Sequence, residues 1–254
     1  MTFEVALQVA ALLALAAFVA GFIDSIAGGG GLITVPVLLL AGADPVTALA
    51  TNKLQGLFGA GAAAVSYARA GQVDLRRQWR AALVACGAAA CGALLASSLP
   101  TGVIRIGLPV VLIAIAAFFA LKPGLDDTDR AARLRPAAFT ATVVPLVAFY
   151  DGLIGPGTGS FLMLGFVMLA GFGILRATAH SKLLNFASNV GGIAAFAAVA
   201  TPWWLTGLAM GAAQMAGAAL GARLALRIGA GLIKPLLVIT STALALRLLW
   251  DAWG

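Results

Sequence analysis

The sequence has few charged residues, and this scarcity fixes its broad class. Only 10% of the 254 residues are charged, whereas 62% are hydrophobic. A soluble domain averages about 25% charged and about 45–50% apolar residues. A soluble fold cannot bury so much apolar surface, so lipid must solvate much of the chain. The sequence therefore predicts an all-α integral membrane protein.

Histidine and cysteine are also scarce, which argues against several function classes. The single His180 and the cysteines Cys86 and Cys91 form no metal-ligand pattern, and no Ser-His-Asp, HExxH or Cys/His set is present. We therefore expect no enzyme activity, no cofactor and no metal. The net charge of +7 lies mainly in short loops, without a basic stripe interleaved with aromatics. No nucleic-acid partner is expected.

Two pairs of segments indicate an internal duplication. AGFIDSIAGGGG resembles AFYDGLIGPGTG and aligns Asp24 with Asp151, at an offset of 151 − 24 = 127. ALATNKL resembles ATAHSKL and aligns Lys53 with Lys182, at an offset of 182 − 53 = 129. The blocks occur in the same order in both halves, so we predict two copies of one folding unit.

A single long hydrophilic segment separates the copies. We predict transmembrane repeats at 1–121 and 137–254, joined by a linker at 122–136. About eight full transmembrane helices are expected, or up to ten crossings if the broken glycine segments are counted. The apolar runs lie at about 4–23, 32–41, 47–68, 81–98, 103–121, 137–150, 160–171, 177–198, 205–226 and 232–250.

The positions of basic residues predict opposite orientations for the two copies. The loop 69–80 holds four arginines and the linker 122–136 is also basic, so both belong in the cytoplasm. The loop 199–204, which is equivalent to 69–80, has no basic residue and belongs outside. Inverted repeats need an odd number of crossings, and five per copy place both termini outside a bacterial inner membrane. Re-entrant glycine segments would instead give four crossings and parallel repeats.

The glycine blocks are candidate substrate-binding segments. Glycine costs a helix about 1 kcal/mol per residue, so each block predicts a break followed by a short half-helix. Two half-helix N-termini that converge near the midplane would form an anion site. Close helix packing at glycine is the alternative interpretation. The residues concerned are Gly28, Gly29, Gly30, Gly31, Gly155, Gly157, Thr158 and Gly159.

Lysines at matching positions are candidate charge-balancing groups. Thr51, Asn52 and Lys53 stand at the start of one long apolar helix, and Lys182 stands at the start of its counterpart. Lysine within a span is costly and usually functional. We expect the pair of lysines to attract and balance a bound anion, the alternative being side chains that extend to the interface.

Further polar residues lie within the spans. Asn185 and Asn189 fall on the face of Lys182, and Gln214 lies in mid-helix. Each is a candidate substrate contact or a hydrogen-bonding group between helices. Asp24 and Asp151 flank the glycine breaks. Each of these two can pair with a lysine, carry a proton that drives transport, or cap the broken helix.

The blocks GFIDSIAGGGGLITVPVLLLAG and ATNKLQG, followed by FYDGLIGPGTGSFLML and RATAHSKLLNFASNVGG, resemble the sulfite exporter TauE/SafE family. The resemblance spans nearly the whole chain. It implies an inner-membrane permease for sulfite, sulfoacetate or related organosulfonates. It also implies functional roles for the matching residues: Asp24, glycines 28–31, Thr51, Asn52, Lys53, Asp151, Gly155, Gly157, Thr158, Gly159, Lys182, Asn185 and Asn189.

The expected function is secondary transport of a small sulfur-containing oxyanion by alternating access. An anion channel on the same scaffold and a non-transporting structural membrane partner are the alternatives. A membrane-embedded enzyme would need a catalytic cluster that the sequence lacks. The expected partners are a small anion and the lipid bilayer, and a homodimer is compatible with the sequence.

Overall fold

The protein is described here from a computed structural model, which covers residues 3–74, 76–100, 127–229 and 231–232. All regular secondary structure in these ranges is α-helical, which confirms the predicted class. Two of the predicted apolar runs, 103–121 and 232–250 apart from Leu232, fall outside the described residues. The helices are α1 (Leu7–Ala27), α2 (Gly31–Leu40), α3 (Pro45–Arg69), α4 (Trp79–Ser98), α6 (Pro136–Leu153), α7 (Thr158–Met168), α8 (Ile174–Val199) and α9 (Trp204–Ile228).

Five of these helices, α1, α4, α6, α8 and α9, are long and apolar enough to cross a membrane. Large apolar side chains such as Leu7, Leu15 and Leu146 are exposed on their outer faces, as lipid contact requires. The helix α3 is as long, but Thr51, Asn52 and other polar residues on it are buried inside the molecule. These features fit a multi-pass membrane protein whose centre is polar.

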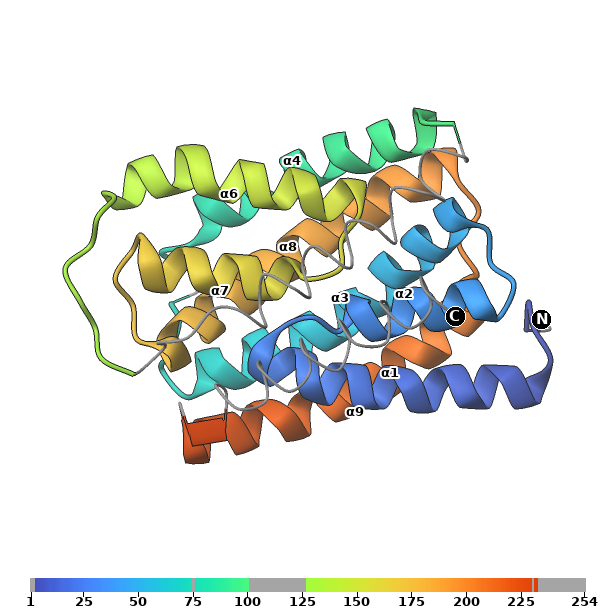
Figure 1. Cartoon of the computed structure of the whole chain (residues 1–254), viewed down its shortest axis with the longest axis horizontal. Coiled ribbons are helices and arrows are strands. Elements are labelled where there is room, and N and C mark those ends of the chain that lie inside the picture. Colours follow the sequence, from blue (N-terminus) through green and yellow to red (C-terminus); the bar gives the residue numbers. More distant parts are fainter. Residues whose placement is uncertain (1–2, 75, 101–126, 230, 233–254) are drawn as a thin grey trace, which may run out of the picture.

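Both glycine segments are turning points rather than simple kinks. After α1, the chain passes through Gly28 at φ +83° and folds back into α2; after α6, Gly155 and Gly157 at φ +95° and +88° lead back into α7. Glycine tolerates this left-handed region at no steric cost. Figure 1 shows each short helix starting inside the molecule and returning toward the end from which its long partner came.

The two long helices before these turns enter from opposite ends. In Figure 1, α1 starts beside the N-terminus, whereas α6 starts at the other end and runs in the opposite direction. These opposite directions are the ones that inverted copies require, and in each half the long helix and its returning half-helix form a hairpin.

The long helices also extend further than predicted. The apolar run predicted a first helix that ends at 23, but α1 continues through Asp24 to Ala27, and α6 continues through Asp151 to Leu153. Aspartate is normally disfavoured at a buried helical position, because removing its charge from water costs free energy. Both carboxylates have polar partners inside the molecule, so neither of them ends its helix.

The helices form two bundles that do not follow the two halves of the chain. Helix α9 packs along α1 and α3, whereas α4 packs along α6 and α8; the contact between α3 and α8 joins the bundles. We call α1, α2, α3 and α9 the first bundle, and α4, α6, α7 and α8 the second bundle. Each sequence half thus gives its fourth described helix to the bundle of the other half.

Matching glycines permit these exchanged contacts. A Cβ at Gly221 of α9 would lie 2.4 Å from the carbonyl oxygen of Phe22 in α1. A Cβ at Gly92 of α4 would lie 2.1 Å from the carbonyl oxygen of Phe149 in α6. Only glycine allows two backbones so close. The two contacts are equivalent in the two copies: the glycines are related by the offset of 221 − 92 = 129, and the phenylalanines by the offset of 149 − 22 = 127.

Candidate functional site

Two buried ion pairs connect the bundles at the level of the glycine turns. Lys182 Nζ of α8 lies 2.8 Å from Asp24 Oδ2 of α1, and Lys53 Nζ of α3 lies 2.7 Å from Asp151 Oδ1 of α6. All four side chains are at least nine-tenths buried. A buried charge without a partner costs several kcal/mol. The crossed pairing therefore neutralises each lysine with a carboxylate from the other half of the chain.

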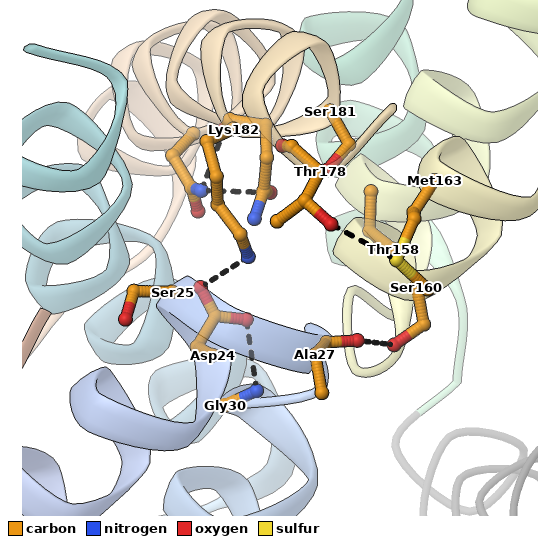
Figure 2. A network of polar contacts seen from close by, with 12 residues as sticks. Asp24, Ser25, Ala27, Gly30, Thr158, Ser160, Met163, Thr178, Ser181 and Lys182 are labelled. Carbon is orange, nitrogen blue, oxygen red and sulfur yellow. Dashed lines mark hydrogen bonds and ion pairs between the residues drawn. The ribbon is translucent and has the colours of Figure 1, made fainter. Parts of the chain in front are cut away.

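The second oxygen of each carboxylate has a different kind of donor. Asp24 Oδ1 accepts a hydrogen bond of 3.0 Å from the backbone N–H of Gly30, so Asp24 bridges its own glycine turn and Lys182, as Figure 2 shows. Asp151 Oδ2 instead accepts a hydrogen bond of 2.6 Å from the Ser188 hydroxyl on α8. The two ion pairs are equivalent in position but not in their surroundings.

A polar cavity lies between these ion pairs. Its free volume of about 30 Å³ is enough for about two water molecules. Both carboxylates reach its wall, and the other groups are glycine backbone, amides and one threonine. The lining residues are Asp24, Gly29, Gly30, Gly31, Asn52, Gly56, Asp151, Gly155, Gly157, Thr158, Gly159, Asn185, Asn189 and Gln214.

The N-termini of both half-helices reach this cavity. Gly31 is the first residue of α2, and Gly159 is the second residue of α7. Their backbone N–H groups have no hydrogen-bond acceptor among the described residues. The first N–H groups of a helix have no partner within it and carry the positive end of the helix dipole. Two such ends at one cavity make it favourable for negative charge.

Amide groups from both bundles add further donors. Asn52 Oδ1 already accepts hydrogen bonds from Thr34 Oγ1 (2.6 Å) and Gln55 Nε2 (3.0 Å). Asn185 Oδ1 accepts one of 3.1 Å from Asn189 Nδ2. With both oxygens occupied, the amide nitrogens of Asn52 and Asn185 are left as donors at the cavity wall. One amide comes from α3 and the other from α8.

Gln214 reaches the cavity because two glycines make room for it. A Cβ at Gly59 of α3 would lie 2.6 Å from Gln214 Cγ, and a Cβ at Gly21 of α1 would lie 2.7 Å from the same atom. Gln214 is 3% exposed, and within the described ranges its Oε1 has no hydrogen-bond partner. A buried amide with an unpaired atom is costly in a purely structural role. Its position at the cavity wall favours contact with a ligand.

The structure brings most of the predicted site residues to this cavity. The exceptions are Gly28, Thr51 and the two lysines. Gly28 lies against Ser160, whose hydroxyl donates to the Ala27 carbonyl (2.8 Å), and Thr51 Oγ1 accepts a hydrogen bond of 2.9 Å from the Trp203 N–H. Both residues support the fold around the site. Sequence reasoning did not select Gly56, although it is the counterpart of Asn185 at the offset of 129.

The lysines lie directly behind the glycine backbone. A Cβ at Gly155 would be 2.9 Å from Lys53 Nζ, and a Cβ at Gly159 would be 2.9 Å from Lys182 Nζ. Each ammonium group is therefore separated from the cavity by a single glycine. The charges of the two lysines and two aspartates sum to zero, so the positive electrostatic character of the cavity comes from the helix ends and the amide nitrogens.

Comparison with known proteins agrees with the membrane character of the fold. A family model described as "Sulfite exporter TauE/SafE" matches residues 13–248. "Probable membrane transporter protein ORF9" of Sinorhizobium sp is 56% identical over 248 residues, which is 98% of this chain and 95% of that protein. "Probable membrane transporter protein YfcA" of Escherichia coli (strain K12) is 43% identical over 238 residues, or 94% and 88% of the two chains.

A third relative, "Probable membrane transporter protein" of Haemophilus influenzae, is 40% identical over 248 residues, or 98% of this chain and 97% of that protein. No solved structure matches the chain.

Proposed function

The chain belongs to the sulfite exporter TauE/SafE family of membrane proteins, and we propose that it is a secondary transporter of a small sulfur-containing oxyanion. Sulfite and organosulfonates such as sulfoacetate are the proposed substrates. The proposed mechanism is alternating access across the bacterial inner membrane. The relatives, which match nearly the full chain, are called membrane transporters.

One observation carries this proposal: two half-helix N-termini meet at a buried cavity. The N–H groups of Gly31 and Gly159 there have no acceptor in the part of the chain that the structure describes, and the amide nitrogens of Asn52 and Asn185 lie at the same cavity. A sulfite or sulfonate group carries three oxygens, each of which accepts hydrogen bonds. Donors arranged around one point recognise such a group better than they recognise a monatomic anion.

The bundles supply two bodies that can move against each other. Both ion pairs, Asp24–Lys182 and Asp151–Lys53, run from the first bundle to the second, and the cavity lies between them. The cavity holds about two water molecules, so a larger anion enters only when the bundles separate. We propose that the moving units are these spatial bundles rather than the two sequence halves.

The opposite directions of α1 and α6 support an inverted arrangement in the membrane. With the basic loop after α3 and the linker before α6 in the cytoplasm, the positive-inside rule is obeyed. In this arrangement, one glycine hairpin enters the membrane from each side. The site is then reached from either side by the same type of motion.

Transport by reconstituted protein tests the proposal. Proteoliposomes loaded with sulfite should take up external [35S]sulfite by exchange, with a rate that saturates as the sulfite concentration rises. Asn185→Ala should raise the half-saturating concentration, whereas Arg76→Ala in the exposed loop should not. A flux that never saturates would instead indicate a channel. No flux and no thermal stabilisation by sulfite, thiosulfate, taurine or sulfoacetate would refute transport of this class.

A further inference from the structure

The two buried carboxylates differ in whether one of their hydrogen-bond partners could accept a hydrogen bond from the protonated form. Asp24 Oδ1 accepts from the Gly30 N–H, and Asp24 Oδ2 accepts from the Lys182 ammonium group. Backbone N–H and ammonium groups can only donate. Neither of these partners could accept a hydrogen bond from a protonated Asp24.

Asp151 faces a group that can reverse its role. The Ser188 Oγ lies 2.6 Å from Asp151 Oδ2 and 3.0 Å from the backbone carbonyl oxygen of Asn185. A hydroxyl group rotates freely and both donates and accepts. When Oδ2 is protonated, the Ser188 hydroxyl can turn its hydrogen to the Asn185 carbonyl and accept the proton of Asp151. Every polar atom then keeps a hydrogen-bond partner, since Asp151 Oδ1 still accepts from Lys53, but the Lys53 ammonium group no longer faces a negative charge.

We propose that Asp151, and not Asp24, carries the proton that accompanies the transported anion. This inference rests on the proposed transport function. One O–H bond forms at Asp151 Oδ2 with a proton from the aqueous side, and no electrons move. Lys53 loses its counter-charge at that moment, and the bound anion replaces it across Gly155. Release reverses the step, so that the proton and the anion leave together.

The surroundings of Asp151 contain few other ionisable groups. Lys53 on α3 is its direct partner, and Asp24 with Lys182 lies across the cavity. Tyr150, the preceding residue on α6, donates its hydroxyl to the Pro156 carbonyl. Helices α2 and α7 contain no ionisable residue. Helix α4 approaches α6 through Ala89 and Gly92, and α9 presents Gln214. The charge of Lys53 is thus balanced by Asp151 or by the ligand.

Coupling follows from the cost of an unpaired buried ammonium group, which is several kcal/mol. Protonation of Asp151 alone exposes Lys53 to this cost, whereas protonation together with anion binding avoids it. Each event therefore favours the other, as thermodynamic linkage requires. The stoichiometry is one proton for each anion at this site.

Proteoliposomes with imposed pH gradients test the assignment. With the outside one pH unit more acidic, the wild type should accumulate [35S]sulfite up to about tenfold over its pH-equilibrated level, because one pH unit is a tenfold proton gradient. Uptake by protein-free liposomes is subtracted. Asp151→Asn should slow exchange and remove the response to the gradient. Asp24→Asn should reduce exchange, while any remaining flux still responds to the gradient. The reverse pattern would overturn the proposal.

Infrared difference spectroscopy covers the case in which a variant fails to fold. Adding sulfite to the wild type at constant pH should produce a carboxylic-acid band. Ser188→Ala should shift this band, and Ser188→Thr, which retains the hydroxyl, should restore it. A wild-type spectrum without the band, or a band unaffected in Ser188→Ala, would overturn the assignment.

Failure of the proposed function has a different signature, since wild-type exchange is then absent at every pH. In that case, acidification spectra of the wild type and Ser188→Ala still identify which buried carboxylate protonates first. The identification of Asp151 as the carboxylate that takes up a proton stands if that band shifts in Ser188→Ala, and it is overturned if the band does not shift.

Discussion

The halves that contain α1–α4 and α6–α9 share a framework but differ in the groups that complete it. Both have a long helix with an aspartate, a glycine turn, a half-helix and a lysine, and each lysine pairs with the aspartate of the other half. The second partner of the aspartate is a backbone N–H in the first half and a serine hydroxyl in the second. Close packing keeps the framework alike, whereas single polar side chains make the surroundings of the two aspartates chemically different.

The helix caps show the same contrast. Asp44 caps α3 locally through hydrogen bonds from Val46 and Thr47, and Asp74 accepts from the turn before α4. In the second half, distant segments provide these groups. Asp127 and Asp129 accept from the start of α8, and Glu4 accepts from the start of α9: the donors are Gly173 N, Leu175 N, Leu205 N and Thr206 N. Gly173 occupies the position of Asp44 at the offset of 129. The second half therefore depends on long-range contacts for its helix starts.

The largest expected effect is on the framework that both halves share. Lys53→Ala and Lys182→Ala each leave a buried carboxylate unpaired, which should cost about 3–5 kcal/mol of stability and abolish saturable sulfite exchange. Thermal unfolding in detergent and proteoliposome flux measure the two effects. The double variant Lys182→Met with Asp24→Asn should recover much of the lost stability. Wild-type flux in both single variants would show that the ion pairs serve no transport function.

The glycine turns should be unequal in their tolerance of alanine. Alanine at positive φ costs about 1–2 kcal/mol, and Gly28, at φ +83° and ψ 176°, lies in a region that is essentially restricted to glycine. At Gly28, the Cβ would also meet Ser160 Oγ at 2.4 Å and its backbone N at 2.5 Å, whereas at Gly155 it would meet only the end of the Lys53 side chain this closely, at 2.9 Å. Gly28→Ala should thus lower the melting temperature more than Gly155→Ala. Gly87→Ala, which meets no atom within 4 Å, is the control. Equal losses at both turns would contradict this account.

The amides should separate binding from stability. Asn185→Ala removes a cavity donor, and it should raise the half-saturating sulfite concentration about five- to tenfold, or about 1–1.4 kcal/mol. Asn52→Ala removes a donor and also the acceptor of Thr34 and Gln55. It should therefore reduce thermal stability as well. If Asn52→Ala changed the half-saturating concentration alone, the hydrogen-bonding role of Asn52 would be secondary.

The smallest effect concerns the helix caps. Asp44→Ala and Asp129→Ala should each cost about 0.5–1 kcal/mol. The hydrogen bond from the Gly173 N–H and the nearby Arg176 guanidinium lower the pKa of Asp129 below its ordinary value of 3.8. A lowered folded-state pKa gives stability above the unfolded pKa that is lost as the pH falls through the folded one. The difference in melting temperature between wild type and Asp129→Asn should therefore shrink below about pH 4. A difference that is constant down to pH 2 would contradict the role of this carboxylate.

Much of the fold and of the site followed from residue patterns. Composition predicted the helical membrane class, the glycine blocks predicted the breaks, and polar residues in apolar runs selected most of the cavity lining. Other features were missed for identifiable reasons. The extension of α1 past Asp24 depends on Lys182, which is 158 residues away, and local patterns carry no such information. Gly56 lines the cavity because its lack of a side chain leaves room beside Asn189. The sequence does not show which glycine borders such a space.

The sequence alone determined that this chain lies in lipid, that two glycine turns interrupt its helices, and that two aspartates and two lysines lie within apolar spans. These properties follow from hydropathy and backbone preferences, which act over short stretches of chain. Only the tertiary structure decided that each lysine pairs with the aspartate of the other half. It also decided that the Ser188 hydroxyl, which can both donate and accept a hydrogen bond, lies against Asp151 and not against Asp24. Such choices depend on contacts of 2.6–2.8 Å between distant segments, and these exist only once α9 has packed on α1 and α4 on α6.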